Sequence, residues 1–391
     1  MPLPLLETLP HELDQYTLLE RLASGGMADV FLAVDRGPRA PRWVAIKRIR
    51  ADLATHREYV GFFETEARLS LACHHPNLPT AFQCGQAGGR PYLALEYIAG
   101  PTVLGLARAA TRRRRPLAVP AVLAIALGAA RALEHLHGLT GPDGQPLDVV
   151  HRDVTPHNLL VAPGGVVKLI DFGVARTAVQ AHRTEVGVIK GKYAYIAPEL
   201  LDRHRLVDQR ADLFSLGVVL HELLTGKPLF HGASDLDTTE RVRAAPIAAP
   251  TSIRPEVPDA VASVIMTALA RDPDRRWPSA AALVDALERA AEQAGVWPWQ
   301  GRLAREVAQL VGGPRRPLLR DGHLRWEPAA PPAASPDDDD DTVTPVIEVR
   351  DEAGTWEAPS VPADPQLSYF LSAGAVEQPW QGNDSTGVGE P

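Results

Sequence analysis

The stretch His151-Arg152-Asp153-Val154-Thr155-Pro156-His157-Asn158 decides the fold, together with Asp171-Phe172-Gly173 shortly after it. An acid, an amide five residues later and a second acid after a short hairpin can converge on one metal and phosphate site. Phosphoryl transfer asks a protein mainly to position its reactants and to neutralise charge. The stretch therefore predicts such a site, which also needs a cation and groups that hold phosphate.

Two segments nearer the N-terminus offer those groups. The turn from Leu22 to Val30 is rich in small residues, which let backbone N–H groups approach a phosphate. Lys47 shares a strand face with Ala45, and a lysine on an apolar face needs an anionic partner. Glu66 follows two phenylalanines at helical spacing, so it lies on the inward helix face and is expected to pair with Lys47. Taken singly, these segments also fit a plain turn, a solvated lysine and an exposed glutamate.

Further motifs follow in order: Ala197-Pro198-Glu199, Asp212 at the start of an apolar helix, and Arg276. With them, residues 16 to 285 resemble the protein kinase family, whose motifs occur here in sequence. The strand-rich first part and helix-rich second part predict an α+β fold of two lobes with a cleft between them. The resemblance implies a small antiparallel-sheet lobe with one helix, a large mainly helical lobe, ATP and Mg²⁺ as cofactors, and protein substrates.

The resemblance also implies roles for individual residues. Asp153 would be the catalytic base, and Lys47, anchored by Glu66, would hold the α- and β-phosphates. Asn158 and Asp171 would bind Mg²⁺. The nucleotide would contact residues that line the cleft: Leu22, Ala23, Gly25, Gly26, Val30, Ala45, Leu95, Glu96, Ile98 and Leu160.

Within that set, backbone groups of Glu96 and Ile98 would hydrogen-bond adenine, with Leu95 as the gatekeeper. Glu199 and Arg276 would form a buried structural ion pair. His151 is expected in the core rather than as an acid–base catalyst.

Several positions depart from the family pattern. Ala23 and Ala28 stand where loop glycines are usual, which predicts weaker phosphate binding. Thr155 replaces a usual lysine after the catalytic aspartate, and Lys192 replaces a usual threonine before Ala-Pro-Glu. Our hypothesis is an exchange in which Lys192 supplies the missing cation and Thr155 hydrogen-bonds across to the region of Asp153.

The segment after Asp171 raises the question of regulation. Arg152 precedes the catalytic aspartate and would pair with a phosphothreonine, so we predict autophosphorylation at Thr177 or Thr184, with Thr184 favoured. Serine/threonine specificity rests on Pro156 and on the resemblance. A pseudokinase that serves as a nucleotide-binding scaffold is the alternative, and a small-molecule phosphotransferase is a more distant one.

Composition narrows the class of protein. The 391 residues carry a formal net charge of −8, which argues against a nucleic-acid binder. Two cysteines exclude a disulfide framework, and the start of the chain does not have the pattern of a signal peptide. The longest apolar stretch, from about Pro116 to Ala130, is too short for a membrane span. A cytoplasmic enzyme is expected.

The chain divides into five predicted parts: an N-terminal extension (1–15), the small lobe (16–98), the large lobe (99–285), a helical extension (286–311) and a tail (312–391). The tail is rich in proline and has five consecutive aspartates at 337–341, which predicts disorder. Docking of a partner by the tail is a weaker alternative. The arginines from Arg112 to Arg115 are expected to form a solvated loop face.

Overall fold

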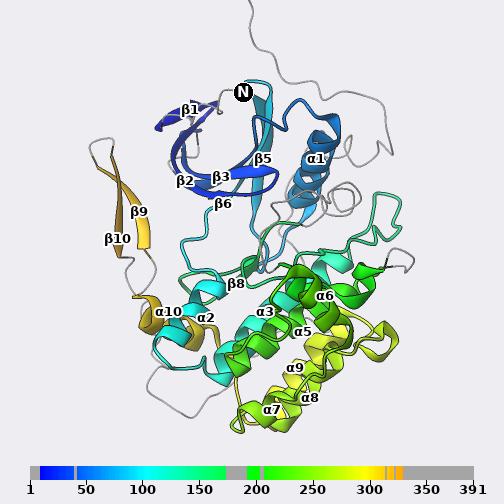
Figure 1. Ribbon diagram of the computed structural model, residues 1–391. Coiled ribbons are helices and arrows are strands. Elements are labelled where there is room, and N and C mark those ends of the chain that lie inside the picture. Colours follow the sequence, from blue (N-terminus) through cyan, green and yellow to red (C-terminus); the bar gives the residue numbers. More distant parts are fainter. Residues whose placement is uncertain are drawn as a thin grey trace, which may run out of the picture.

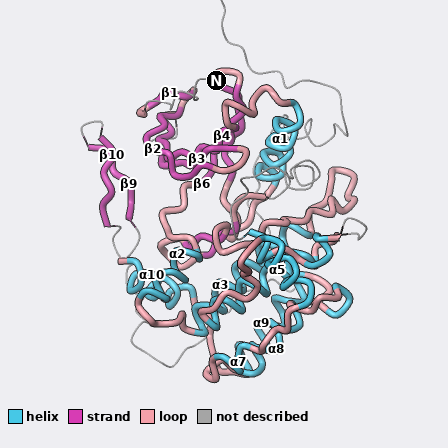
Figure 2. The backbone as a smooth tube through the Cα atoms, in the orientation of Figure 1, coloured by secondary structure: helices cyan, strands magenta, loops and turns pink. Residues whose placement is uncertain are grey.

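A computed structural model describes residues 9–38, 42–172, 192–202, 207–312, 315–320 and 323–328. A sheet with one helix forms the upper lobe, and a larger group of helices forms the lower lobe (Figure 1). Figure 2 shows the upper lobe as strands with the helix α1 (Arg57–Ala72) beside them and the lower lobe as mainly helices. The predicted α+β fold of two lobes is confirmed.

The small lobe is a six-stranded antiparallel sheet in the order β1-β2-β3-β4-β6-β5. Its strands are β1 (His11–Leu13), β2 (Tyr16–Ser24), β3 (Ala28–Asp35), β4 (Arg42–Ile49), β5 (Ala81–Ala87) and β6 (Arg90–Glu96). β1 lies in the segment predicted as an extension, and its Leu13 is buried. Only one inward residue marks this short strand, so it shows no alternating pattern in the sequence.

Helix α1 (Arg57–Ala72) packs on this sheet. Its inward face carries Phe63, Glu66, Ala67 and Ser70, all buried. The helical spacing of Glu66 therefore predicted its burial correctly.

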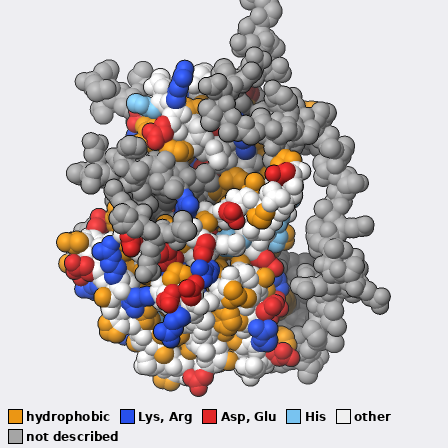
Figure 3. Space-filling model, turned by 90° about the vertical axis from the view of Figure 1, so that its right-hand side faces the viewer, with side chains coloured by type: hydrophobic (Ala, Val, Ile, Leu, Met, Phe, Trp, Pro, Cys, Tyr) orange, Lys and Arg blue, Asp and Glu red, His pale blue; other side chains and the backbone are white. Residues whose placement is uncertain are grey.

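The large lobe is built around two buried helices, α3 (Val119–His137) and α5 (Arg210–Thr225). The other helices are α2 (Val103–Arg112), α6 (Asp235–Ala244), α7 (Pro250–Ile253), α8 (Asp259–Ala268), α9 (Ala280–Gln293) and α10 (Gln300–Val311). A two-stranded hairpin of β7 (Leu159–Val161) and β8 (Val167–Leu169) lies at the top of this lobe. On the side shown in Figure 3, acidic and basic side chains are interspersed, as on a solvated surface.

Helix α3 is long and apolar enough to cross a membrane by length and composition alone. However, 78% of its most apolar window is buried inside the described structure. Helices α5, α9 and α10 pack against it, and Pro120 occupies its first turn, where a missing N–H costs nothing. It is the central core helix of the large lobe.

The C-terminal part differs from the prediction in two respects. The predicted boundary between residues 285 and 286 falls inside α9, which is one continuous helix. The segment predicted to be disordered from residue 312 onward contains a hairpin of β9 (Arg315–Arg320) and β10 (His323–Pro328). Its charged residues and Pro317 hide the alternation that would reveal a strand, and it gains stability from contacts with distant parts of the chain.

The predicted ion pair of the large lobe is present. Arg276 donates from Nη1 to Glu199 Oε1 at 2.6 Å and from Nη2 to Oε2 at 2.7 Å. Both side chains are almost fully buried, and Arg276 also donates to the backbone carbonyls of Ala270 and Arg210. The pair therefore ties the Ala-Pro-Glu segment to the start of α5 and to the loop before α9.

We predict that Glu199→Gln lowers the free energy of unfolding by about 3–5 kcal/mol, because it leaves a buried guanidinium without its carboxylate. Urea unfolding followed by circular dichroism measures the change. Glu288→Gln, which breaks the exposed pair with Arg131, is the matched control and should change little. Equal midpoints for both variants would contradict the structural role of Glu199.

Candidate nucleotide and phosphoryl-transfer site

Three charged side chains from separate segments meet between the lobes. Lys47 of β4 contacts Glu66 of α1, and its Nζ donates to Asp171 Oδ1 at 2.8 Å. Lys47 and Glu66 are 9% and 4% exposed. The predicted pairing of Lys47 with Glu66 is therefore present, with Asp171 as a second anion.

The charge of Lys47 is stabilised by this arrangement. Burial alone would lower its pKa, but the carboxylates of Asp171 and Glu66 more than offset that effect and leave the pKa raised. The side chain consequently stays a cation at neutral pH. A cation held between the lobes is suited to an anionic ligand.

Hydrogen bonds to the Asp212 carboxylate hold the loop that carries Asp153 in place. The backbone N–H groups of His151 and Arg152 donate to Asp212 at 2.8 and 2.7 Å, and His137 Nε2 lies 2.8 Å from the same carboxylate. Burial would raise the pKa of Asp212, but these hydrogen bonds and the nearby histidines lower it. The sequence marked Asp212 only as the start of a helix, so its anchoring role was missed.

His151 is a core residue, as predicted. It is fully buried, and its ring meets the ring of Phe172 edge to face, with centroids 5.9 Å apart. Burial lowers its pKa despite the neighbouring carboxylates, so the ring stays neutral. It supports the loop of Asp153 and Phe172 by packing.

The expected metal ligands lie close to Asp153 in the fold. Asn158 Nδ2 donates to the Asp153 carbonyl at 2.9 Å, which leaves the amide oxygen of Asn158 for a ligand. Asp171 follows Ile170, whose N–H donates to the Asn158 carbonyl at 2.8 Å. Hard oxygen donors of this kind suit Mg²⁺. In the described part of the chain no three His, Cys, Asp or Glu residues form a metal cluster.

Backbone conformation at this site is unusual in two places. Arg152 has φ 61° and Asp171 has φ 59°, in the left-handed region that non-glycine residues rarely adopt. Such conformations persist where the surrounding contacts determine them, and they gather at functional sites. Here the hydrogen bond from the Arg152 N–H to Asp212 is one such contact.

The small-residue turn between β2 and β3 folds back on itself. Gly25 donates its N–H to the Ala28 carbonyl at 2.9 Å, and a Cβ on Gly25 would lie 3.2 Å from that oxygen. A Cβ on Gly26 would have nothing within 4 Å, so this glycine borders open space. Ala23 and Ala28 lie at the strand ends that flank the turn.

Three of the residues expected around adenine share one face of the sheet. Leu95 pairs with Ala45, and Val30 pairs with Lys47, which lies two residues after Ala45 on the same strand. Val30, Ala45, Leu95 and Leu160 are partly buried, and Leu22 is 39% exposed.

The segment between the lobes is held by contacts of its own. Glu96 donates its N–H to the Thr80 carbonyl at 2.8 Å, while the N–H of Ile98 has no acceptor among the described residues. Lys168 of β8 donates to the Glu96 carboxylate at 2.7 Å and to the Leu78 carbonyl at 3.1 Å. This lysine fixes the segment, and no local pattern pointed to it.

Other predicted residues are not brought together in the described structure. The side chain of Lys192 lies outside it, as do Thr177, Thr184 and Gly173. Thr155 is 2% exposed, and its Oγ1 has no hydrogen-bond partner among the described residues. The expected hydrogen bond from Thr155 to the region of Asp153 is therefore not formed there.

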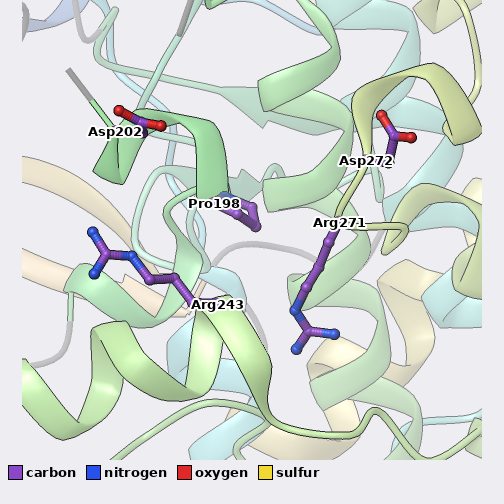
Figure 4. A pocket seen from close by; sticks show the side chains of 5 residues that line it. All are labelled: Pro198, Asp202, Arg243, Arg271 and Asp272. Atoms are coloured by element: carbon purple, nitrogen blue, oxygen red, sulfur yellow. The ribbon is translucent and has the colours of Figure 1, made fainter. Parts of the chain in front are cut away.

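A separate pocket of about 460 Å³ lies beneath the Ala-Pro-Glu segment, lined by Pro198, Asp202, Arg243, Arg271 and Asp272 (Figure 4). The two guanidinium groups point in different directions. Both are engaged with backbone carbonyls, Arg243 with Leu201 at 2.8 Å and Arg271 with Val242 at 2.9 Å. None of its lining residues belongs to the cleft, so we assign the pocket no part in the site.

The fold and the site together define a bilobal protein in which Lys47 and Glu66 of the small lobe meet Asp171 of the large lobe. The family model described as the protein kinase domain matches residues 16–287, and the chain belongs to the protein kinase family. This family uses ATP with Mg²⁺.

Named relatives agree with this assignment. The chain is 40% identical over 274 residues to "Tyrosine-protein kinase MasK" of Myxococcus xanthus, covering 70% of this chain and 42% of that protein. It is 35% identical over 285 residues to "Serine/threonine-protein kinase PknB" of Mycolicibacterium smegmatis, covering 71% and 43%. The chain thus spans less than half the length of these relatives. The crystal structure of the Mycobacterium tuberculosis PknI kinase domain matches with TM-score 0.54 at 25% identity, over 74% of this chain and all of that one.

We predict that Lys47→Met weakens Mg–ATP binding about tenfold or more, because it removes a charge-assisted contact. Titration calorimetry measures the affinity, and the rise in unfolding temperature at saturating Mg–ATP checks it. Arg48→Met is the matched control: Arg48 is also buried and adjacent on β4, but it donates to the Ala87 carbonyl instead. Equal nucleotide affinities in the two variants would contradict the assignment of Lys47.

Proposed function

We propose that the chain is a serine/threonine protein kinase that transfers the γ-phosphoryl group of ATP to protein hydroxyls. The observation that carries this proposal is the meeting of Lys47 with Asp171, because these residues come from different lobes and lie 124 residues apart in sequence. The contact brings the cation proposed to hold the phosphates next to a carboxylate proposed to hold Mg²⁺.

Each residue has a defined task in this proposal. Asp153 accepts the proton of the acceptor hydroxyl as the new phosphorus–oxygen bond forms and the bond to the β-phosphate oxygen breaks, which releases ADP. Lys47 neutralises the α- and β-phosphates and is kept in place by Glu66. Asn158 and Asp171 would hold Mg²⁺, which offsets phosphate charge when bound.

The nucleotide base would rest against Val30, Ala45 and Leu160, with backbone groups of Glu96 and Ile98 on its polar edge. The N–H of Ile98, which has no acceptor among the described residues, supports this placement. A cytoplasmic location and docking of partners by the C-terminal tail remain predictions.

The class of acceptor hydroxyl is the finer part of the proposal. Pro156 in the catalytic loop and the likeness to PknB support serine and threonine, whereas MasK is named a tyrosine kinase. Pro156 is buried, and its carbonyl accepts the Leu104 N–H at 2.8 Å.

We expect radiolabel to pass from ATP to the chain itself and to a generic basic protein, and to be recovered as phosphoserine or phosphothreonine. Asp153→Asn should reduce the rate by about 10²–10⁴ because it removes the base. Recovery of phosphotyrosine alone would overturn the acceptor class. Nucleotide binding without any transfer would favour the pseudokinase alternative, and transfer that survives Asp153→Asn would point to a contaminant.

We also propose that Lys192 replaces the lysine that Thr155 displaces. The support from the described structure is the buried hydroxyl of Thr155, which has no partner there and is free to accept a hydrogen bond from an ammonium group.

We predict that Lys192→Met lowers kcat about a hundredfold, because a cation that stabilises transferring charge is removed. The double change Thr155→Lys with Lys192→Thr should restore most of it. Steady-state kinetics at saturating ATP measure both. Parent-like turnover in Lys192→Met would refute the exchange.

A further inference from the structure

The C-terminal hairpin of β9 and β10 contacts the nucleotide cleft from outside. Trp326 of β10 donates from Nε1 to the Glu20 carboxylate of β2 at 2.9 Å. Its ring also meets the ring of Tyr97, with centroids 6.3 Å apart. One side chain thus joins a strand of the small lobe to the segment that connects the lobes.

Both contact points flank residues assigned to nucleotide binding. Glu20 lies two residues before Leu22, where the small-residue turn begins, and Tyr97 lies between Glu96 and Ile98. Trp326 and Tyr97 are both partly buried, and burial together with the charge of Glu20 raises the pKa of Tyr97 to about 12. The contact therefore lies at the adenine edge of the cleft.

Helix α10, which precedes the hairpin in the chain, is anchored in the large lobe. Leu303, Val307 and Leu310 of α10 are buried in its core. Glu306 accepts the Ala118 N–H at 2.9 Å. Gly165 has φ 84°, and a Cβ there would lie 2.0 Å from the Gln300 carbonyl oxygen, so the chain approaches the start of α10 closely.

The hairpin follows α10 closely in the chain, so α10 holds it near the large lobe. It begins four residues after α10 ends, and β9 and β10 pair over their full length, from Arg315 with Pro328 to Arg320 with His323. Trp326 is opposite Pro317, which is buried. Figure 1 shows the hairpin standing upright beside the sheet of the small lobe, above α10.

We propose that Trp326 is a positioning residue for the nucleotide site, holding Tyr97 and Glu20 in the arrangement that receives adenine. It acts through these two residues. The inference rests on the proposed kinase function, because it assigns the adenine site to the same cleft.

Trp326→Ala is expected to raise the KM for ATP and the dissociation constant of Mg–ATP about fivefold, from loss of a hydrogen bond and a ring contact. The kcat at saturating ATP should stay within about twofold, because the acids and Lys47 are untouched. Trp326→Phe keeps the ring but loses the N–H donor, so it should fall between the parent and Trp326→Ala. Arg325→Ala, an exposed neighbour on β10, is the matched control and should bind as the parent does.

A double-mutant cycle tests the route of the effect. If Trp326 acts through Tyr97 and Glu20, then adding Trp326→Ala to the pair Tyr97→Ala and Glu20→Ala should weaken binding little further. Fully additive losses would overturn the proposal, as would parent-like affinity in Trp326→Ala or an equal fall in kcat and in kcat/KM. Titration calorimetry reads nucleotide binding without phosphoryl transfer, so failure of the kinase assay and failure of this inference are distinguishable.

Discussion

Burial of charge between the lobes is the constraint on which the site depends. An ammonium group removed from water is strongly destabilised unless carboxylates lie next to it, and Lys47 meets two. Those carboxylates come from α1 and from the segment after β8. The sheet of the small lobe, α1 and the β7–β8 hairpin must therefore all be correctly packed before the charge of Lys47 is compensated. The site and the interface between the lobes are therefore stabilised by the same contacts.

Much of this arrangement was predictable because its signals are local. Helical spacing placed Glu66 on the inward face of α1, and strand alternation placed Lys47 beside Ala45 on the face toward the cleft. The buried pair of Glu199 and Arg276 was expected only from the family resemblance, since nothing in the spacing of these two residues joins them.

The contacts that the sequence did not reveal join residues far apart in the chain. Asp212 accepts hydrogen bonds from the backbone N–H groups of His151 and Arg152, about sixty residues earlier. Every residue other than proline has a backbone N–H, so residue types do not indicate such a donor. The sequence did not single out Lys168 and assigned Glu96 only a backbone role, because their side chains meet only once β8 is in place. The hairpin was missed for the same reason, because Trp326 gains its partner from Glu20, 306 residues away.

The two lobes hold different parts of the site, and Trp326 contacts both the small lobe and the segment that connects the lobes. Asp153 and the strained Asp171 are fixed by the large lobe, which holds its loops through Asp212 and the packing of His151. Lys47 lies on the small lobe, and the segment that contains Tyr97 joins the two lobes. Trp326 is attached to the large lobe through α10 and contacts that segment and β2. It therefore links the two lobes at the side of the site that would receive the base, away from the charged groups around Lys47.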